Sequence, residues 1–516
     1  MSGSAMDRRQ LLRLGGALST LGVAAPFAMQ LAAAGSAASQ SAGDYKALVC
    51  VFLFGGNDAH NMVLATDTDS WGRYFATRNT GADPIALLPV GTAPTPVGQV
   101  NSVTGRVADM GSPEAWGGVL PITPKTVQKI PEGTNATSRT FALHPFMAPL
   151  QTLFSQGRLA VLANVGTLIQ PTTKAQYQAK SVGIPTSLFS HNDQQSTWQA
   201  LSTEGARAGW GGRFADLTAS MNGGNSLFTA VSASGNAVFL SGQSVVQYQL
   251  STGAQPAVVI GGQQGSSLFG SSLGPSRVKD LITDTSLTSN FAADYSAVVA
   301  RSISAASTVN GAFTQPIVSG VPAATAYTNP LTQRVETNTL ALQLQTVARM
   351  IAASSVLGVK RQVFFVSLGG WDSHDLQNTA QPNLLAKVAH ALSYFDGALS
   401  NIGGIDRRAQ VTAFTASDFG RSFTTNGDGT DHAWGAHHFI MGGAVNGGDI
   451  YGQYPTLGVD VNGFNNPDNV GGALIPTTSV DQYGATLGRW FGIGDADIDV
   501  IFPRARNFAT KYLTFV

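Results

Sequence analysis

Residues 362–375 read QVFFVSLGGWDSHD, and residues 410–443 read QVTAFTASDFGRSFTTNGDGTDHAWGAHHFIMGG. In each segment a run of apolar and β-branched residues ends in a turn that carries an acidic residue, Asp372 in the first and Asp418 in the second. This pattern is typical of buried parallel strands, and open α/β sheets bind ligands at the carboxyl ends of such strands. The two segments therefore predict an α/β fold that brings Asp372 and Asp418 to one edge of a sheet.

Histidines are concentrated in the same part of the chain. Five of the eight histidines in the sequence fall within residues 362–443. Histidine and aspartate together are common ligands of zinc, manganese and iron. The alternative is a hydrogen-bonded network of aspartate and histidine that only ties loops together. The metal interpretation predicts a divalent ion (zinc, manganese or iron) bound by Asp372, His374, Asp418 and His432.

The strand pattern recurs elsewhere in the chain. Between residues 372 and 411, apolar residues at helical spacing predict a crossover helix that joins two parallel strands. Short β-like runs separated by Gly and Ser predict a β-rich insertion at about 222–310. We expect one central, mostly parallel sheet flanked by helices. Its strands are the apolar runs at 47–54, 159–165, 363–368 and 411–415.

The run at 47–54 ends in the turn GGNDAHN, residues 55–61. Asn57 and Asp58 in this turn have two interpretations. They are either the first metal ligands at the carboxyl edge of the sheet or simply turn formers, as asparagine and aspartate commonly are. The metal hypothesis places both residues at the same edge as Asp372, with Asp58 completing the ligand shell.

Residues 187–198 read SLFSHNDQQSTW. Ser190 precedes residues with helical character, which predicts a helix N-cap. The alternative uses the same position, because a helix N-terminus stabilises an anion and a hydroxyl group there can act as an activated nucleophile. In that interpretation Ser190 and the neighbouring His191 are candidate catalytic residues.

Length and composition restrict the classes of protein. A chain of 516 residues suits one large α/β domain with insertions, or two domains. Its 30 basic and 30 acidic residues balance, and without a basic run the chain has no electrostatic footprint for nucleic acid. The single Cys50 lies in an apolar run, so no intrachain disulfide can form and a buried, inert thiol is expected.

The N-terminus has the features of an export signal. Arg8 and Arg9 precede an apolar stretch from residue 14 to about 34, which is followed by small residues suited to cleavage. This predicts a twin-arginine signal peptide over residues 1–38, use of the twin-arginine translocase, and a periplasmic or extracellular location. The alternatives are an ordinary secretory signal or a membrane anchor. The paired arginines favour the first interpretation, and since no later stretch has about 20 uninterrupted apolar residues, no stable membrane insertion is expected.

Several motifs occur together in an order that resembles a known family. They are the twin-arginine signal, FLFGGNDAHN, SHNDQQSTWQ, SLGGWDSH, SDFGR, GTDHAWG and the closing TSVDQYGATLGRWFG. Over nearly the whole mature chain this order resembles the exported bacterial domain-of-unknown-function family numbered fifteen-oh-one. That family is grouped with the alkaline phosphatase and sulfatase superfamily. The resemblance implies an alkaline phosphatase-like α/β domain over residues 45–516 and a site with one or two metals.

The same resemblance implies roles for particular residues. Asp372 and His374 resemble the Asp-x-x-x-His pair of the superfamily, with a shorter spacing. Asp418 resembles the acid of its Asp-His pair, although Phe419 follows it. The remaining implied positions are His432 or His437 as the replacement imidazole, Asn57 or Asp58 as the first-strand ligand, and Ser190 as the nucleophile.

Two functions compete on these observations. The first is an exported metal-dependent hydrolase that acts on phosphate or sulfate esters of a small molecule or polymer, in which a metal polarises the ester. Arg421, three residues after Asp418, would hold an oxygen of the phosphate or sulfate, or else form a salt bridge. The second is a non-catalytic exported protein that keeps the fold for binding or assembly, with or without a metal. Phe419 favours the second function, whereas the Asp and His side chains at strand ends favour the first.

Overall fold

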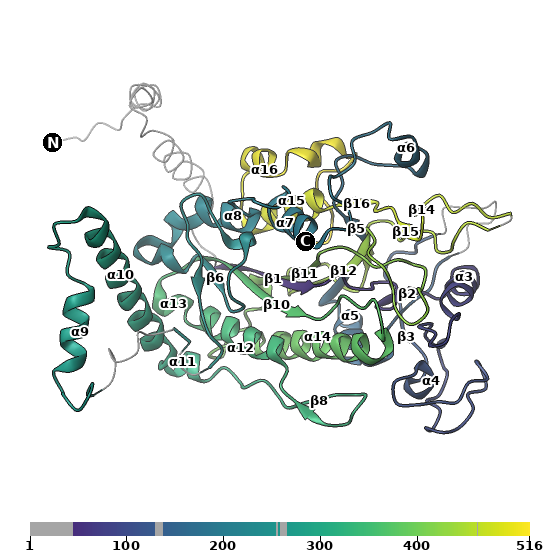
Figure 1. Ribbon diagram of the computed structural model, residues 1–516, viewed down its shortest axis with the longest axis horizontal. Coiled ribbons are helices and arrows are strands. Elements are labelled where there is room, and N and C mark those ends of the chain that lie inside the picture. Colours follow the sequence, from purple (N-terminus) through teal and green to yellow (C-terminus); the bar gives the residue numbers. More distant parts are fainter. Residues whose placement is uncertain (1–44, 130–137, 254–255, 258–265, 462) are drawn as a thin grey trace.

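A nine-stranded sheet forms the centre of the protein in the computed structural model, which describes residues 45–129, 138–253, 256–257, 266–461 and 463–516 (Figure 1). The strand order is β13, β5, β12, β11, β1, β10, β6 and β7, and β16 also pairs with β5. The strands are β1 (Lys46–Phe54), β5 (Leu159–Gly166), β6 (Ala230–Ser232), β7 (Tyr248–Gln249), β10 (Arg361–Gly369), β11 (Val411–Ser417), β12 (Ala436–Met441), β13 (Ile450–Tyr451) and β16 (Thr478–Ser479).

The four predicted strands all belong to this sheet and run in the same direction. β1 pairs in parallel with both β10 and β11. β12 lies between β11 and β5 and is antiparallel to both, so the sheet is mixed but mostly parallel. The sequence did not reveal β12, because its residues AHHFIM interrupt the apolar pattern with two histidines.

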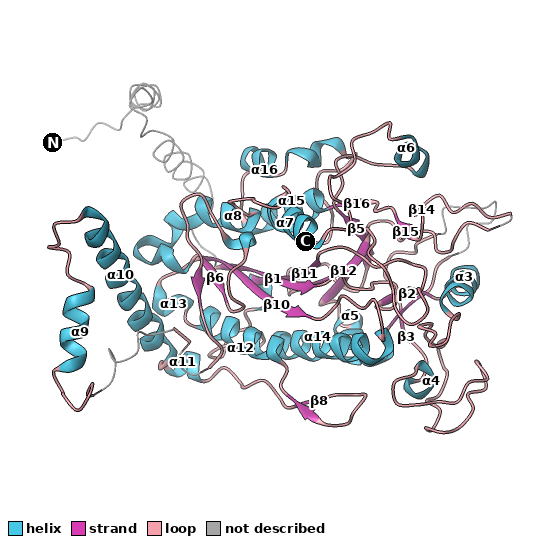
Figure 2. Ribbon diagram, viewed as in Figure 1, coloured by secondary structure: helices cyan, strands magenta, loops and turns pink. Residues whose placement is uncertain are grey.

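Helices cover both faces of the sheet (Figure 2). The pleat of β1 sends Val49 and Val51 to one face and Leu48 and Cys50 to the other. Cys50 is therefore a buried free thiol, as expected. The first face packs on α5 (Ala148–Ser155), α12 (Thr339–Ala352) and α14 (Gln377–Leu399), and the second on α7 (His191–Ala200), α8 (Trp210–Thr218), α15 (Val480–Phe491) and α16 (Asp495–Ile501).

The predicted crossover helix is α14, which joins β10 to β11. It buries Leu385, Val388, Leu392, Phe395 and Leu399 against the sheet. The two strands are parallel but do not pair with each other, since β1 lies between them and pairs with each. The apolar character of β1 on both faces suits this central position.

The β-rich insertion expected at about 222–310 differs from what the described residues form. Its strands β6 and β7 are short and belong to the edge of the central sheet. The segment also contains two α-helices, α9 (Gly274–Ile282) and α10 (Asn290–Phe313). The alanine-rich sequence of α10 favours a helix, and its Ser289 side chain caps the first turn.

The remaining elements surround the sheet. No helix among the described residues combines the length and apolar character needed to cross a bilayer. The predicted signal peptide at residues 1–38 lies outside the described residues. The peripheral elements are β2 (Val63–Ala65), α3 (Thr68–Arg78), α4 (Pro113–Trp116), β3 (Leu120–Ile122), β4 (Phe141–Leu143), α6 (Lys174–Ala179), α11 (Pro316–Ser319), β8 (Tyr327–Thr328), β9 (Val335–Glu336), α13 (Ser354–Leu357), β14 (Asn469–Val470) and β15 (Ala473–Leu474), with 3-10 turns at Pro145–Met147, Ala219–Phe228, Val238–Leu240, Arg408–Gln410 and Pro503–Asn507.

Candidate metal centre

The carboxyl ends of β1, β10 and β11 meet at one edge of the sheet. Parallel register places Phe54, the last residue of β1, beside Gly369, the last residue of β10. The turns that follow these two strands touch: a Cβ atom at Gly55, whose φ is +119°, would lie 2.5 Å from the backbone N of Asp372. Position 55 therefore favours glycine, and the close contact between the two turns fixes the position of the Asp372 backbone just after β10.

Four side chains converge just beyond this edge, and we call them the His/Asp cluster. The Asp372 carboxylate lies 3.3 Å from Nε2 of His191, 3.1 Å from Nε2 of His374 and 3.2 Å from Nε2 of His432. The Nε2 atoms of His374 and His432 are 2.9 Å apart. One ligand atom from each of His191, Asp372 and His432 lies within 4.8 Å of the other two.

Two of the imidazoles are oriented through Nδ1. Nδ1 of His432 donates to the carbonyl oxygen of Phe189 at 2.7 Å. A carbonyl group only accepts, so the neutral His432 ring keeps its lone pair on Nε2, which faces the cluster. Nδ1 of His191 lies 2.7 Å from Oδ2 of the buried Asp418. Metal-binding histidines usually have such a partner behind the ring.

The other two members of the cluster also have partners behind them. Nη1 of the fully buried Arg421 donates to Oδ1 of Asp372 at 2.5 Å. The same guanidinium donates to the Thr430 hydroxyl and to the Thr430 carbonyl, which holds it in place. Nδ1 of His374 lies 3.4 Å from Oδ1 of Asp431. Each of the four side chains therefore has a polar partner outside the cluster.

The protonation states follow from these contacts. Burial raises the pKa of Asp372, but the hydrogen bond and charge of Arg421 outweigh it and lower the pKa, so this carboxylate stays ionised. Burial also lowers the pKa of His432, which favours the neutral ring. The hydrogen bond to Asp418 raises the pKa of His191. A metal ion would therefore compete with a proton at His191.

The cluster fits a divalent transition metal. With metal–nitrogen bonds of about 2.0–2.1 Å, neighbouring ligand atoms of a tetrahedral site lie roughly 3.3 Å apart. The Asp372 carboxylate lies 3.1 to 3.3 Å from the three Nε2 atoms. Among the described residues, the group whose ligand atoms all lie within 4.8 Å of one another is His191, Asp372 and His432. Imidazole and carboxylate ligands suit zinc, manganese or iron better than a soft metal. Side-chain exposures of 23% to 43% leave the cluster open to solvent and to small molecules.

Comparison with protein families supports the resemblance carried by the motifs. Residues 45–502 match the family described as "Protein of unknown function (DUF1501)". The chain belongs to this family. The match includes every residue of the His/Asp cluster. No curated protein matches the chain. Kinship with the alkaline phosphatase and sulfatase superfamily stays a prediction.

In this DUF1501 protein, the start of α7 presents an imidazole to the cluster rather than a hydroxyl group. Ser190 occupies the N-cap position, but its side chain makes no capping hydrogen bond. Its Oγ instead donates to Oδ2 of Asp193 at 3.1 Å. The N-cap position predicted for Ser190 is confirmed, whereas its role as a nucleophile stays a prediction. His191, expected to be catalytic, is a candidate ligand.

Asp418, predicted as a metal ligand, lies behind the cluster and binds the imidazole of His191. Its Oδ2 accepts hydrogen bonds from His191 and, at 2.8 Å, from Nε2 of Gln195. The ring of Phe419 packs against the rings of His191 and His432, with centroid distances of 4.9 and 4.5 Å. The imidazole beside Asp418 thus comes from His191 of α7, which sequence spacing could not reveal.

Asp58, a predicted ligand, forms a buried ion pair instead. Arg78 of α3 binds both carboxylate oxygens, at 2.6 and 3.1 Å, and Nε2 of Gln377 donates to Oδ2 at 2.6 Å. Gln377 in turn accepts a hydrogen bond from the Thr430 hydroxyl, next to Arg421. Asp58 therefore supports the layer behind the cluster. The sequence gave no indication that Arg78, twenty residues later, would be its partner.

The last two predicted ligands also lie outside the cluster. The side-chain amide of Asn57 lies 3.2 Å from the sulfur of Met62, and its backbone N–H donates to Ser417. His437 is buried on β12, accepts a hydrogen bond from the backbone N–H of Asn164, and stacks on Tyr454 at 4.5 Å. Burial holds the pKa of His437 well below its ordinary value, so this ring is a neutral part of the core.

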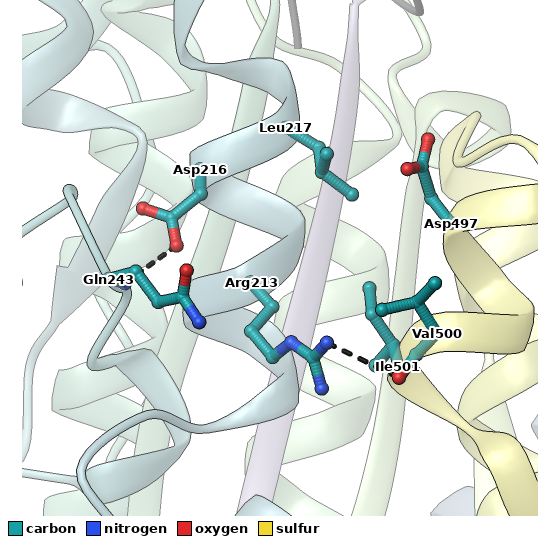
Figure 3. Close-up of a pocket in the computed structure, with 7 residues that line it drawn as sticks. All are labelled: Arg213, Asp216, Leu217, Gln243, Asp497, Val500 and Ile501. Carbon is teal, nitrogen blue, oxygen red and sulfur yellow. Dashed lines mark hydrogen bonds between the residues drawn. The ribbon is translucent and has the colours of Figure 1, made fainter. Parts of the chain in front are cut away.

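A separate cavity of about 120 Å³ lies between α8 and α16 (Figure 3). Arg213 there donates to the carbonyl oxygen of Val500 at 3.3 Å, and Asp216 accepts from the backbone N–H of Gln243 at 2.7 Å. No member of the His/Asp cluster lines this cavity, so it is not part of the metal centre. The residues that line it are Arg213, Asp216, Leu217, Gln243, Asp497, Val500 and Ile501.

Proposed function

We propose that the His/Asp cluster binds one divalent transition metal and that the protein is an exported metal-dependent hydrolase of phosphate or sulfate esters. The observation that carries the proposal is the convergence of the Nε2 atoms of His191, His374 and His432 on the carboxylate of Asp372. The motif resemblance supports the ester class, and the partial exposure of these side chains leaves room for a substrate.

The protein residues around the metal would each have a distinct task. His191, His432 and Asp372 would hold the ion, with His374 beside them, and the charge of the ion would polarise an ester oxygen as a Lewis acid. Arg421 compensates the charge of Asp372 and fixes the position of its carboxylate. The hydrogen-bond partners of the histidine Nδ1 atoms direct the Nε2 atoms toward the centre, so these nitrogens are already in position before a metal or substrate binds.

Ser190 is poorly placed to attack an ester, because its hydroxyl binds Asp193. Water is then the nucleophile that best suits an open site. The proposal predicts that Ser190→Ala keeps its bound metal and its turnover. Loss of turnover with the metal retained would instead assign Ser190 as the nucleophile.

A second candidate function is a non-catalytic exported protein that uses the metal centre for binding or assembly. The orientation of Ser190 and the Phe419 ring, which packs on two of the imidazoles, favour this alternative. Both functions need the metal, so the first experiment is elemental analysis of the folded protein, followed by the variants Asp372→Ala and His432→Ala. His390→Ala is the matched control, since His390 binds Thr325 and Asn338 far from the cluster.

The outcome separates the candidates. We expect a stoichiometric metal that both cluster variants lose and the control keeps. Hydrolysis of an aryl phosphate or aryl sulfate that depends on this metal would support the hydrolase. A bound metal without turnover on either ester would leave the binding function. Metal-free wild-type protein after incubation with zinc, manganese and iron would refute the metal centre and the hydrolase, and would leave only a binding function without a metal.

Export by the twin-arginine route is part of the proposal and rests on Arg8 and Arg9. Changing both residues to lysine should leave the precursor in the cytoplasm. Normal export of that variant would show that another route is used.

A further inference from the structure

Helices α9 and α10 lie side by side at one end of the molecule, away from the central sheet (Figure 1). The first half of α10 exposes large apolar side chains: Phe291 is 86% exposed, Tyr295 65% and Val298 49%. Spacings of four and three residues place these three side chains on one face of the helix. Such a patch on a soluble surface usually marks an interaction site.

A groove of about 540 Å³ lies beside the same face of α10. Pockets of about 300–1,000 Å³ accept a drug-sized molecule, so this groove has room for aromatic side chains. Val246, which also lines the groove, is 71% exposed. The lining residues are Asn225, Leu227, Phe228, Val246, Gln247, Tyr248, Val298, Arg301, Ser302, Ser304, Ala305 and Thr308.

We propose that this surface binds a second copy of the same chain, with two α10 helices packed antiparallel across a twofold axis at Val298. In that arrangement, residues equally far before and after Val298 face each other. Tyr295, three residues before, meets Arg301 of the second copy, three residues after. Phe291, seven residues before, meets Ala305, seven residues after, in the groove. Each copy thus supplies the aromatic side chains and the groove that receives them, as an isologous interface requires.

The charges on this part of the chain agree with a second copy as partner. Arg301 forms no ion pair with any other described residue, and its guanidinium would lie over the Tyr295 ring of the other copy. Anionic lipid would require an excess of basic residues, which the two helices lack. Over residues 274–313 the basic residues Arg277, Lys279 and Arg301 are balanced by Asp280, Asp284 and Asp294.

A disulfide at the proposed axis tests the geometry directly. Val298→Cys places one thiol from each copy opposite the other, and Cys50, the single native cysteine, is buried and does not compete. Diamide should convert this variant into a covalent dimer. The control is Val335→Cys, because Val335 is 72% exposed on β9, outside the surface. Equal cross-linking of the two variants would overturn the proposal.

Sedimentation of the folded, full-length mature protein tests the association itself. We expect a dimer whose dissociation constant rises by about tenfold or more in Phe291→Asp and in Tyr295→Asp, as for central aromatic residues of an interface. Val335→Asp should leave it unchanged. A wild-type monomer at every soluble concentration would refute the proposal. So would a monomer that binds phosphatidylcholine vesicles through Phe291 and Tyr295.

Discussion

Replacing Asp418 with asparagine tests whether the residue behind His191 controls metal binding. Oδ2 of Asp418 lies 2.7 Å from Nδ1 of His191, and the side chain is fully buried. The asparagine amide has no charge, so it is a weaker hydrogen-bond acceptor than the carboxylate. Its NH₂ group can also donate to Nδ1 of His191, which would put the ring hydrogen on Nε2, the atom that faces the metal. Changes to such supporting residues typically reduce metal affinity 10- to 100-fold, or about 1.4–2.8 kcal/mol.

The assay is a competition titration of zinc between the protein and a chromogenic chelator. Asp375→Asn is the matched control, because Asp375 is an exposed aspartate three residues after Asp372 and undergoes the same change of charge. Its affinity should stay within about twofold, since solvent screens an exposed charge. Thermal unfolding of both metal-free variants shows whether the fold is intact. Wild-type affinity in folded Asp418→Asn would refute the role assigned to this hydrogen bond.

Three further predictions concern folding. Arg78→Ala should lower the free energy of unfolding by about 3–5 kcal/mol in urea titration, because it leaves the Asp58 carboxylate buried without its ion pair; a change below about 1 kcal/mol would contradict this. Gly55→Ala should cost roughly 1–3 kcal/mol from its φ of +119° and weaken zinc binding through the contact with Asp372; unchanged stability and affinity would show that the turn relaxes. Burial raises the pKa of Asp481 from 3.8 to about 6. The folded protein therefore holds this proton more tightly than the unfolded chain. As the pH rises from 3.8 to about 6, the free energy of unfolding should fall by up to about 3 kcal/mol. Asp481→Asn should flatten that part of the pH profile, and an unchanged profile would assign the pH dependence to other groups.

Four strands of the central sheet, β1, β5, β10 and β11, could be predicted from the sequence because each contains a run of apolar and β-branched residues. Burial on both faces leaves no polar position in β1 after Lys46, so the run itself indicates a central strand. β12 lacked this signal because His437 and His438 interrupt it, and only the neighbouring strands and aromatic rings show why two neutral imidazoles are tolerated there.

The His/Asp cluster was predictable only in part. Asp372, His374 and His432 were predicted as ligands, because they follow strands or lie in the glycine-rich loop beside them. Asp418 was assigned to the same shell, although its carboxylate binds His191 from behind. Two side chains at the ends of adjacent strands look alike in sequence, whether they point toward a ligand or toward the side chain that holds it.

By itself, the sequence determined the α/β class, the parallel strands and the edge of the sheet where acidic and histidine side chains gather, because strand periodicity and turn residues act locally. Tertiary structure alone decided the partners: His191 from α7 joins Asp372, and Arg78 from α3 takes Asp58 away from the cluster. The physical reason is that hydrogen bonds and ion pairs depend on distances of about 3 Å between segments far apart in the chain, and no local pattern encodes those distances.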